Sequence, residues 1–315
     1  MKVAAHGAME GSGRRVGGMM RLPDFLIIGA MKAGTTTLYR DLAAHPRIYM
    51  PSFKEPETLT CEDGPDSGDR FGYRALFGAA HDEQICGEAS TAYAKRPTFE
   101  GVADRARRRA GSQLKVIYLV RNPLDRAISH HRHESGVGHL PENLEEALRV
   151  DNTLLDYSRY AWQIEPWMDA LGCGQVRIIR FESYIRDRRP TVASVSRFLG
   201  LEPRVDLVQT ERIYNPSQGK PQLRGAWRSL RRNPIYDQLL RLLLPAGART
   251  WLRHRLLPRD RKRPEPLSLA AADRFLDQVR SDADQLARLM GQSKPLWDFD
   301  EIRSRFCPDP VQGRQ

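Results

Sequence analysis

A lysine inside a short glycine-containing loop is the first feature of the sequence that could carry chemistry. Lys32 lies in the loop Gly29–Gly34, between the apolar run Phe25–Ile28 and a predicted helix that begins at Thr35. The first backbone N–H groups of a helix have no partners within the helix, and the helix dipole adds partial positive charge there. A strand, a glycine loop and a helix N-terminus in this order predict an anion site, with the ammonium group of Lys32 beside it.

The position of this lysine separates the loop from the usual nucleotide-kinase pattern. That pattern places a lysine directly after its second glycine, followed by a serine or threonine that binds Mg²⁺. Here Lys32 comes two residues before Gly34, and the threonines 35–37 follow the glycine. The loop therefore lacks the usual Lys-Ser/Thr pair. It can still hold one 5′-phosphate and place an ammonium group beside a leaving oxygen.

A second strand-to-helix junction follows further along the chain. The run Lys115–Val120 predicts an interior strand, Arg121 and Asn122 close it, and Pro123 suits the first turn of a helix. Arg121 thus lies at the carboxyl end of its strand, where parallel α/β sheets bind their ligands. Its planar guanidinium suits phosphate and sulfate oxygens.

Taken together, the two junctions resemble the sulfotransferases that use 3′-phosphoadenosine-5′-phosphosulfate (PAPS). The resemblance is to the branch with a Lys-x-Gly-Thr loop, found in carbohydrate sulfotransferases and many bacterial relatives. It implies that the loop binds the 5′-phosphosulfate and that the second junction holds the 3′-phosphate. A later segment, Asn215–Lys220, resembles the family's loop over the 3′-phosphate and adenine, although a solvated turn explains Lys220 equally well. The donor-binding residues implied in this way are Lys32, Ala33, Gly34, Thr35, Thr36, Thr37, Arg121, Ser129, Gly219 and Lys220.

The chemistry that the resemblance implies is sulfuryl transfer, in which SO₃ moves in line between two oxygens, much as in phosphoryl transfer. Lys32 is the catalytic candidate for balancing the charge on the departing 5′-phosphate, without a metal. The acceptor hydroxyl needs a base that removes its proton. Glu55 matches the family's Lys-Glu-Pro form of the base motif.

The acceptor side of the pattern leaves alternatives open. The family's usual His-aromatic-aromatic continuation after the base is absent, and Glu57-Thr58-Leu59 stands there instead, so Glu57 is a rival base. The segment Gly87–Tyr93 resembles the family segment that lines the acceptor cleft. Within it, Glu88 and Ser90 are candidates for substrate binding.

Strands and helices alternate around these candidates. We expect helices over residues 35–44, 123–134, 154–171, 190–199 and 270–290, and a third strand over 176–181. The alternation predicts an α/β fold of three layers, α/β/α, with a central parallel sheet and a P-loop-like phosphosulfate-binding loop. We expect a flexible leader over 1–20, a single sulfotransferase domain over 21–306 and a tail over 307–315.

The composition of the chain limits the kinds of binding partner and the cellular compartment that we expect. The 315 residues carry a net charge of +11, and only eight of the 50 basic residues are lysines, which fits small anions, nucleic acid or a membrane surface alike. Four scattered cysteines without a C-x-x-C pair predict a reduced, cytoplasmic protein without a metal. No apolar run approaches the ~20 residues of a membrane helix.

A histidine cluster and an Arg- and Leu-rich segment each have more than one interpretation. Of His130, His131 and His133, only His130 and His133 share a helix face, and no nearby pattern completes a tetrahedral metal site. The Arg- and Leu-rich segment 224–263 has three interpretations: a helical cap over the acceptor cleft, an oligomer contact, or an amphipathic helix that contacts a membrane surface for a lipid-linked acceptor.

The leading hypothesis is a sulfotransferase that moves the sulfuryl group from PAPS to a hydroxyl of a carbohydrate, glycolipid or small metabolite. The alternative enzyme is a P-loop-type nucleotide or small-molecule kinase. A nucleic-acid-binding module is the weakest alternative, because the anion sites are ordered strand-loop-helix junctions and not a basic stripe with interleaved aromatics. The identity of the acceptor and the oligomeric state are not encoded in any motif that we find.

Overall fold

A five-stranded, all-parallel sheet organises the protein, and its strand order is β2-β3-β1-β4-β5. The structure, a computed structural model, describes residues 21–62, 72–211 and 267–306. The strands are β1 Phe25–Gly29, β2 Ile48–Tyr49, β3 Ile85–Ala89, β4 Lys115–Val120 and β5 Val176–Arg180. The predicted α/β class and the parallel sheet are confirmed.

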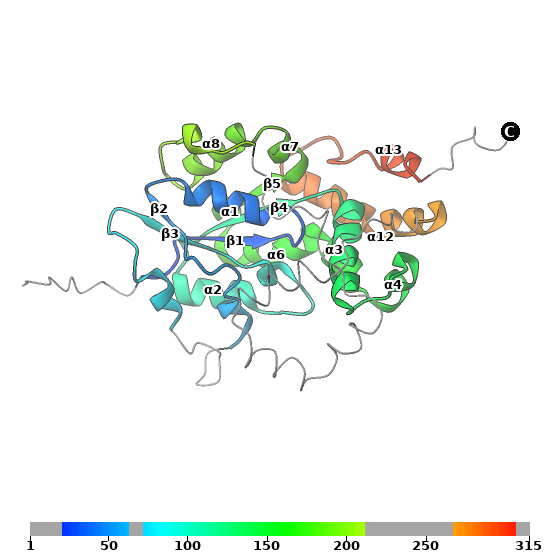
Figure 1. Cartoon of the computed structure of the whole chain (residues 1–315), viewed down its shortest axis with the longest axis horizontal. Coiled ribbons are helices and arrows are strands. Elements are labelled where there is room, and N and C mark those ends of the chain that lie inside the picture. The colour runs from blue at the N-terminus through cyan, green and yellow to red at the C-terminus, as the bar shows by residue number, and fades with distance from the viewer. Residues whose placement is uncertain (1–20, 63–71, 212–266, 307–315) are drawn as a thin grey trace, which may run out of the picture.

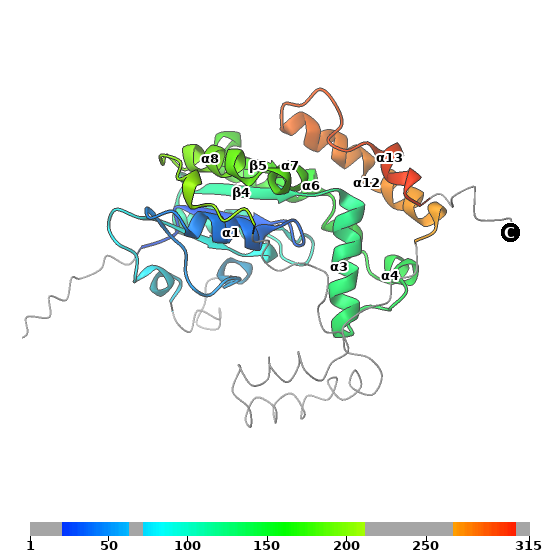
Figure 2. The ribbon, with the colours of Figure 1, turned by 45° about the horizontal axis from the view of Figure 1, so that its top comes forward.

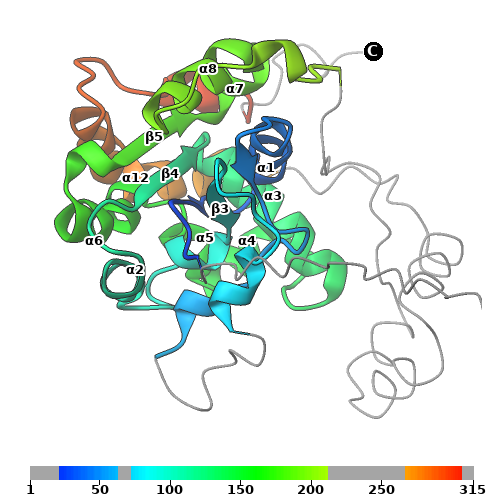
Figure 3. The ribbon, with the colours of Figure 1, turned by 90° about the vertical axis from the view of Figure 1, so that its left-hand side faces the viewer.

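Helices cover both faces of the sheet. In Figures 1 and 3, α1, α7 and α8 lie on one face, whereas α2 and α6 lie on the other. The helices on these faces are α1 Thr35–Ala43, α2 Val102–Ala110, α6 Tyr160–Leu171, α7 Phe181–Arg186 and α8 Arg188–Phe198. The predicted three-layer arrangement, with helices on both faces of a parallel sheet, is confirmed.

The remaining helices gather beyond the carboxyl end of β4. Figure 2 shows α3 running away from that end of the sheet, with α4 and α12 beside it. They are α3 Pro123–Val137, α4 Leu144–Val150, α5 Thr153–Asp156, α12 Leu269–Leu289 and α13 Phe299–Ser304. Short 3₁₀ helices span Thr58–Thr60, Tyr73–Phe77, Thr91–Ala94, Cys173–Gln175 and Val205–Leu207. Among the described residues, no helix is both long and apolar enough to cross a membrane.

The sheet is the centre of the hydrophobic core. Every residue of β1 is buried, as are Val116–Val120 of β4, which explains why both strands read as continuous apolar runs and not as alternating ones. A buried ion pair fixes α1 over this core: the Arg188 Nε donates to Asp41 Oδ2 at 2.9 Å, and the Tyr184 hydroxyl donates to the same oxygen at 2.6 Å. This triad ties the helix that follows the glycine loop to α7 and α8.

One predicted helix is wrong as a continuous element. Residues 154–171 form two helices, α5 and α6, which are separated at Tyr157–Arg159. The reason is a cap from a distant helix: the Asp282 carboxylate on α12 accepts from the N–H groups of Ala161 and Trp162, at 3.0 and 2.9 Å, and so starts a new helix. A contact between residues so far apart in the chain leaves no trace in local periodicity.

Candidate active site

The glycine loop joins the central strand β1 to α1. The Ala30 N–H donates to the Leu119 carbonyl at 2.7 Å and so extends the pairing with β4, and the Ala33 N–H donates to the Ala30 carbonyl at 3.0 Å. Gly34 is the N-cap of α1, in a left-handed conformation with φ of 88° and without a side-chain cap. The first turn therefore presents the backbone N–H groups of Thr35 and Thr36 where the sequence predicts an anion, whereas the Thr37 N–H donates to the Gly34 carbonyl at 3.0 Å.

Gly34 is required here for space as well as for backbone conformation. A Cβ atom at this position would lie 2.8 Å from two ring carbons of Phe181, the first residue of α7. Only glycine accommodates both the left-handed backbone and the ring. The aromatic ring thus packs directly against the loop.

Arg121 connects the two predicted anion-binding elements. Its guanidinium lies over the Phe181 ring, 4.9 Å from the ring centroid, and its Nη1 donates to the Lys32 carbonyl oxygen at 3.1 Å. Lys32 itself adopts a left-handed conformation, with φ of 69°. The loop after β1 and the arginine after β4 therefore lie side by side, as their places at adjacent strand ends predict.

The start of α3 is fixed as the sequence predicts. Asn122 is the N-cap, and its side-chain oxygen accepts from the N–H groups of Leu124 and Asp125 at 3.1 and 3.2 Å, with Pro123 in the first turn. Ser129 is buried on this helix, 5% exposed. The second junction therefore holds Arg121 and Ser129 on one rigid strand-to-helix unit.

Positive charges gather around His130 on α3. Burial lowers the pKa of His130 to about 2, and the nearby positive groups of Arg126, Lys95 and Lys32 lower that pKa further. Arg126 is fully buried, and its guanidinium donates to the Ser158 hydroxyl at 2.7 Å and to the Leu154 carbonyl at 2.6 Å. His130 is therefore neutral at physiological pH, and the positive potential of this region comes from lysine and arginine.

Two further histidines of α3, His131 and His133, and His139 in the loop that follows it have neighbouring polar groups. The His131 ring bonds with the Pro141 carbonyl at 2.8 Å, and Glu134 lies within 4.0 Å of the rings of both His133 and His139. In the described part of the chain, no group of three or more histidine, cysteine or acidic residues has the arrangement of a metal site.

Glu55 is held by the end of β3. Its backbone N–H donates to the Ala89 carbonyl at 2.9 Å, and its carboxylate oxygen Oε2 accepts from the Thr91 N–H at 2.5 Å and from the Thr91 hydroxyl at 3.2 Å. The other oxygen, Oε1, pairs with the Lys54 ammonium. The Glu55 side chain is 31% exposed, so the carboxylate is fixed and still reaches solvent.

Glu57 is held only through its backbone. Its N–H donates to the Ser90 hydroxyl at 3.1 Å, and its carbonyl accepts from the Thr60 hydroxyl at 2.7 Å. Among the described residues, the Glu57 carboxylate has no hydrogen bond or ion pair. Glu55 and Glu57 lie in the same loop, but only the Glu55 carboxylate is oriented by the protein.

Glu88 lies beneath this loop in the interior. It is 1% exposed, and burial raises the pKa of its carboxyl to about 8, against the opposing effect of the neighbouring Tyr93 and Tyr73 hydroxyls. The negative charge of Glu55 raises the Glu88 pKa as well. Glu88 is therefore mostly protonated at neutral pH, as an uncharged buried acid.

The comparisons with known proteins agree with this geometry. Residues 108–229 match the family model described as "Sulfotransferase domain". This part of the chain is thus similar to sulfotransferase domains. The match spans β4, Arg121, α3, β5 and α7, which is the part of the site that surrounds the second junction.

The individual relatives of this chain are distant. The chain is 24% identical over 306 residues to the mouse bifunctional heparan sulfate N-deacetylase/N-sulfotransferase 1, covering 90% of this chain and 32% of that protein. It is 29% identical over 228 residues to the mouse heparan sulfate glucosamine 3-O-sulfotransferase 6, covering 69% and 61% of the two chains. The chain thus spans about a third of the first relative and less than two thirds of the second.

A solved structure shows the same fold. The sulfotransferase from Alicyclobacillus acidocaldarius superposes with a TM-score of 0.58 at 23% identity, covering 87% of this chain and 98% of that one. At this identity the likeness supports the fold and not the identity of a substrate.

The structure brings most of the predicted site residues to one edge of the sheet. The loop with Lys32 follows β1, Arg121 follows β4, and the Glu55 carboxylate is bonded to the segment that follows β3. Glu88 and Ser90 are buried, and Ser90 holds the backbone of Glu57. Their direct contact with an acceptor stays a prediction. Gly219, Lys220 and the segment 224–263 lie outside the described residues.

Three residues that contact or lie near the predicted site residues escaped the sequence analysis. Phe181 was placed at the end of a strand, but it begins α7 and packs against both Gly34 and Arg121. Thr91, which bonds the Glu55 carboxylate, and Lys95, whose charge reaches His130, were not singled out. The one available signal was the acceptor-side segment Gly87–Tyr93, which contains Thr91 and ends two residues before Lys95.

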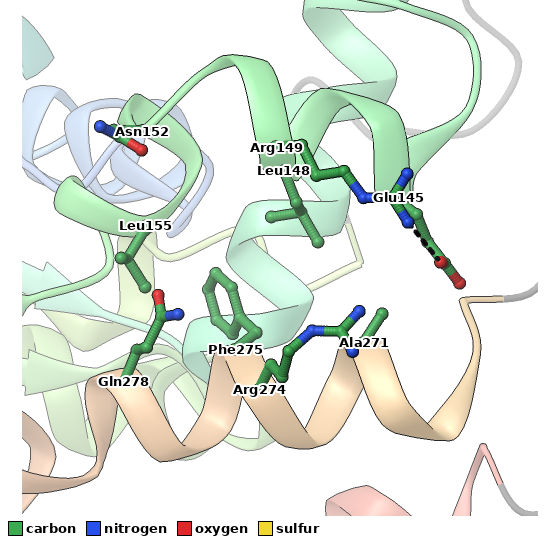
Figure 4. A pocket seen from close by; sticks show the side chains of 9 residues that line it. All are labelled: Glu145, Leu148, Arg149, Asn152, Leu155, Ala271, Arg274, Phe275 and Gln278. Atoms are coloured by element: carbon green, nitrogen blue, oxygen red, sulfur yellow. Dashed lines mark ion pairs between the residues drawn. The ribbon is translucent and has the colours of Figure 1, made fainter.

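A separate pocket lies away from these residues. Figure 4 shows a cavity of about 470 Å³ between α4, α5 and α12, where Arg149 pairs with Glu145 at 3.8 Å. None of the predicted site residues lines it. The lining residues are Glu145, Leu148, Arg149, Asn152, Leu155, Ala271, Arg274, Phe275 and Gln278.

Proposed function

We propose that this chain is a PAPS-dependent sulfotransferase that moves the sulfuryl group of PAPS to an acceptor hydroxyl. The observation that carries the proposal is the contact between Arg121 and the Lys32 carbonyl, because it joins two anion-binding elements at neighbouring strand ends. A donor with phosphates at both its 5′ and 3′ positions requires two such elements at a fixed separation. The match of residues 108–229 to the sulfotransferase domain model supports this assignment.

Each residue at this edge has a role in the proposed reaction. The N–H groups of the loop and of the first turn of α1 bind the 5′-phosphosulfate, and Arg121 and Ser129 bind the 3′-phosphate. The acceptor oxygen attacks sulfur, the bond between sulfur and the bridging 5′-phosphate oxygen breaks, and the acceptor proton passes to the Glu55 carboxylate. The ammonium of Lys32 balances the charge that develops on the departing phosphate. The products are a sulfate ester and adenosine 3′,5′-bisphosphate (PAP).

For the acceptor, we propose a sugar hydroxyl of a carbohydrate or glycolipid, with a small metabolite as the alternative. The name of the first relative specifies N-sulfation of heparan sulfate, and that of the second specifies 3-O-sulfation of its glucosamine. Both names specify a glycan, and the second specifies a sugar hydroxyl. The acceptor side of this chain differs from the usual motif, because Glu57-Thr58-Leu59 follows the Lys-Glu-Pro of the base. We therefore propose the class of acceptor and not one particular glycan.

The test is a transfer assay with radiolabelled PAPS against a panel of sugars, phenols, lipids and aminoglycoside-like alcohols, with products identified by mass. We expect a labelled sulfate ester from at least one sugar and PAP as co-product, without added metal. Calorimetry with PAP measures the donor site independently of the acceptor. Phosphoryl transfer from ATP and Mg²⁺, together with no binding of PAP, would contradict the proposal and favour a kinase.

A further inference from the structure

The Glu55 carboxylate is oriented by a single residue on another segment, Thr91. Both donors of Thr91, its backbone N–H and its hydroxyl, bond the same carboxylate oxygen, Oε2, at 2.5 and 3.2 Å. Thr91 is buried, 8% exposed, and directly follows the buried Ser90 at the end of β3. A glutamate side chain has three rotatable torsions, and two donors on one oxygen remove most of that freedom.

The hydrogen-bond donors around the Glu55 carboxylate show which of its lone pairs is left for an acceptor. A carboxylate offers about four lone-pair sites, two on each oxygen. Thr91 fills both sites of Oε2, and the Lys54 ammonium fills one site of Oε1. The described residues supply no further donor to Glu55, so one lone pair of Oε1 is left to receive a proton from an acceptor hydroxyl.

The same segment holds the whole acceptor-side loop in register. The Ala89 carbonyl accepts from the Glu55 N–H, the Ser90 hydroxyl accepts from the Glu57 N–H, and the Tyr93 hydroxyl accepts from the Leu59 N–H at 3.4 Å. These three contacts all bond the backbone of the loop. The contacts of Thr91, in the same segment, bond a side-chain carboxylate instead. The backbone contacts would hold the loop even if the Thr91 hydroxyl were removed, which makes the role of that hydroxyl separable by mutation.

We propose that Thr91 is a positioning residue that holds Glu55 as the base for sulfuryl transfer, with the free lone pair of Oε1 facing the acceptor. The inference rests on the proposed function. It also selects between the two rival carboxylates, because Glu57 has no comparable support for its side chain. The hydrogen bonds of Thr91 within the described residues go to Glu55 and not to the donor-binding loop, so its replacement is expected to act on turnover and not on donor affinity.

The test uses Thr91→Val, which keeps the shape and the backbone N–H but removes the hydroxyl donor, and Thr91→Ser, which restores the donor. The reaction followed is release of labelled sulfate from PAPS with water as the acceptor, together with transfer to any sugar that the panel identifies. We expect kcat to fall about tenfold in Thr91→Val and to stay within about twofold of the wild type in Thr91→Ser. PAP affinity should be unchanged in both variants.

A matched control removes a threonine hydroxyl from the loop that carries Glu55 and Glu57. The exposed Thr60 hydroxyl bonds the Glu57 carbonyl, so Thr60→Val should leave kcat unchanged. An undiminished kcat in Thr91→Val, an equal loss in Thr91→Ser, or an equal loss in Thr60→Val would overturn the inference.

A second readout needs no turnover. In protein labelled with ¹³C at the glutamate carboxyl, the Glu55 resonance is assigned by its absence in Glu55→Gln. It should shift in Thr91→Val and keep its wild-type position in Thr91→Ser, whereas an unchanged resonance in Thr91→Val contradicts the contact. A wild-type chain that binds no PAP and releases no sulfate contradicts the proposed function instead, and the resonance then decides by itself whether Thr91 holds Glu55.

Discussion

The guanidinium of Arg121, at the end of β4, donates a hydrogen bond of 3.1 Å to the backbone carbonyl of Lys32, in the loop after β1. The same guanidinium lies over the ring of Phe181, which also limits position 34 to glycine. One arginine thus contacts both the loop proposed to hold the 5′-phosphosulfate and the ring that packs on it. The proposed 5′-phosphosulfate loop and the proposed 3′-phosphate residue Arg121 are therefore in direct contact.

Replacing Lys32 should remove most of the turnover while the donor still binds. In Lys32→Ala the developing charge on the 5′-phosphate loses its counter-charge, and we expect kcat to fall about a hundredfold or more. Labelled PAPS turnover and PAP calorimetry measure the two effects separately. Lys294→Ala, at an exposed lysine outside the site, is the matched control. A near-normal kcat in Lys32→Ala would refute the role of the ammonium.

Arg121 should account for recognition of the 3′-phosphate. A hydrogen bond to a charged group contributes about 1.5–3 kcal/mol, so Arg121→Ala should weaken PAP binding by about tenfold to a hundredfold. Adenosine 5′-phosphate, which lacks the 3′-phosphate, tests the assignment. The preference of the wild type for PAP over this ligand should largely disappear in Arg121→Ala. If the variant binds both ligands more weakly by the same factor, Arg121 acts through the loop and not on the 3′-phosphate.

Of the two acceptor-side carboxylates, only Glu55 should be needed for turnover. Glu55→Gln keeps the shape of the side chain but cannot take a proton, so sulfuryl transfer should fall by at least about a hundredfold with little change in PAP affinity. Glu57→Gln is the matched control, and its turnover should stay close to that of the wild type. The reverse pattern would make Glu57 the base.

Gly34→Ala should disturb both stability and donor binding. The added methyl group would lie 2.8 Å from the Phe181 ring, in a left-handed backbone with φ of 88° that side chains disfavour. We expect a lower melting temperature and weaker PAP binding. The double variant Gly34→Ala/Phe181→Leu should recover part of the loss, because it relieves the collision but not the backbone strain. No recovery would mean that the backbone conformation alone accounts for the requirement.

The raised pKa of the buried Glu88 should make the stability of the folded chain depend on pH. Its pKa is raised from 4.5 to about 8 in the folded chain, so between these values the folded state binds a proton that the unfolded state releases. The contribution of this group to stability is greatest below pH 4.5 and is lost as the pH rises to about 8.

Glu88→Gln, which is neutral at every pH, should therefore gain stability relative to the wild type as the pH rises through this window. Denaturant unfolding at several pH values measures the difference between the two proteins. A difference that does not change with pH would show that the Glu88 carboxyl does not titrate in this way.

The two strand-to-helix junctions were predictable from the sequence because their signals are local. A buried strand, a glycine loop with Lys32, and a helix start lie within a dozen consecutive residues, and Arg121-Asn122-Pro123 closes the second strand in the same manner. The physical reason is that strand burial, glycine conformation and helix capping act between near neighbours in the chain. The α/β class follows from the repetition of such units.

The partners of these residues depended on the order of the strands. Thr91 bonds Glu55 across 36 positions and Arg121 bonds Lys32 across 89 positions, because β3 and β4 flank β1 in the sheet. The break between α5 and α6 arises in the same way, from Asp282 on a helix far along the chain. Contacts of this kind depend on which strand ends become neighbours in space. Hydrophobic periodicity and loop residues carry no information about that neighbourhood until the sheet is assembled.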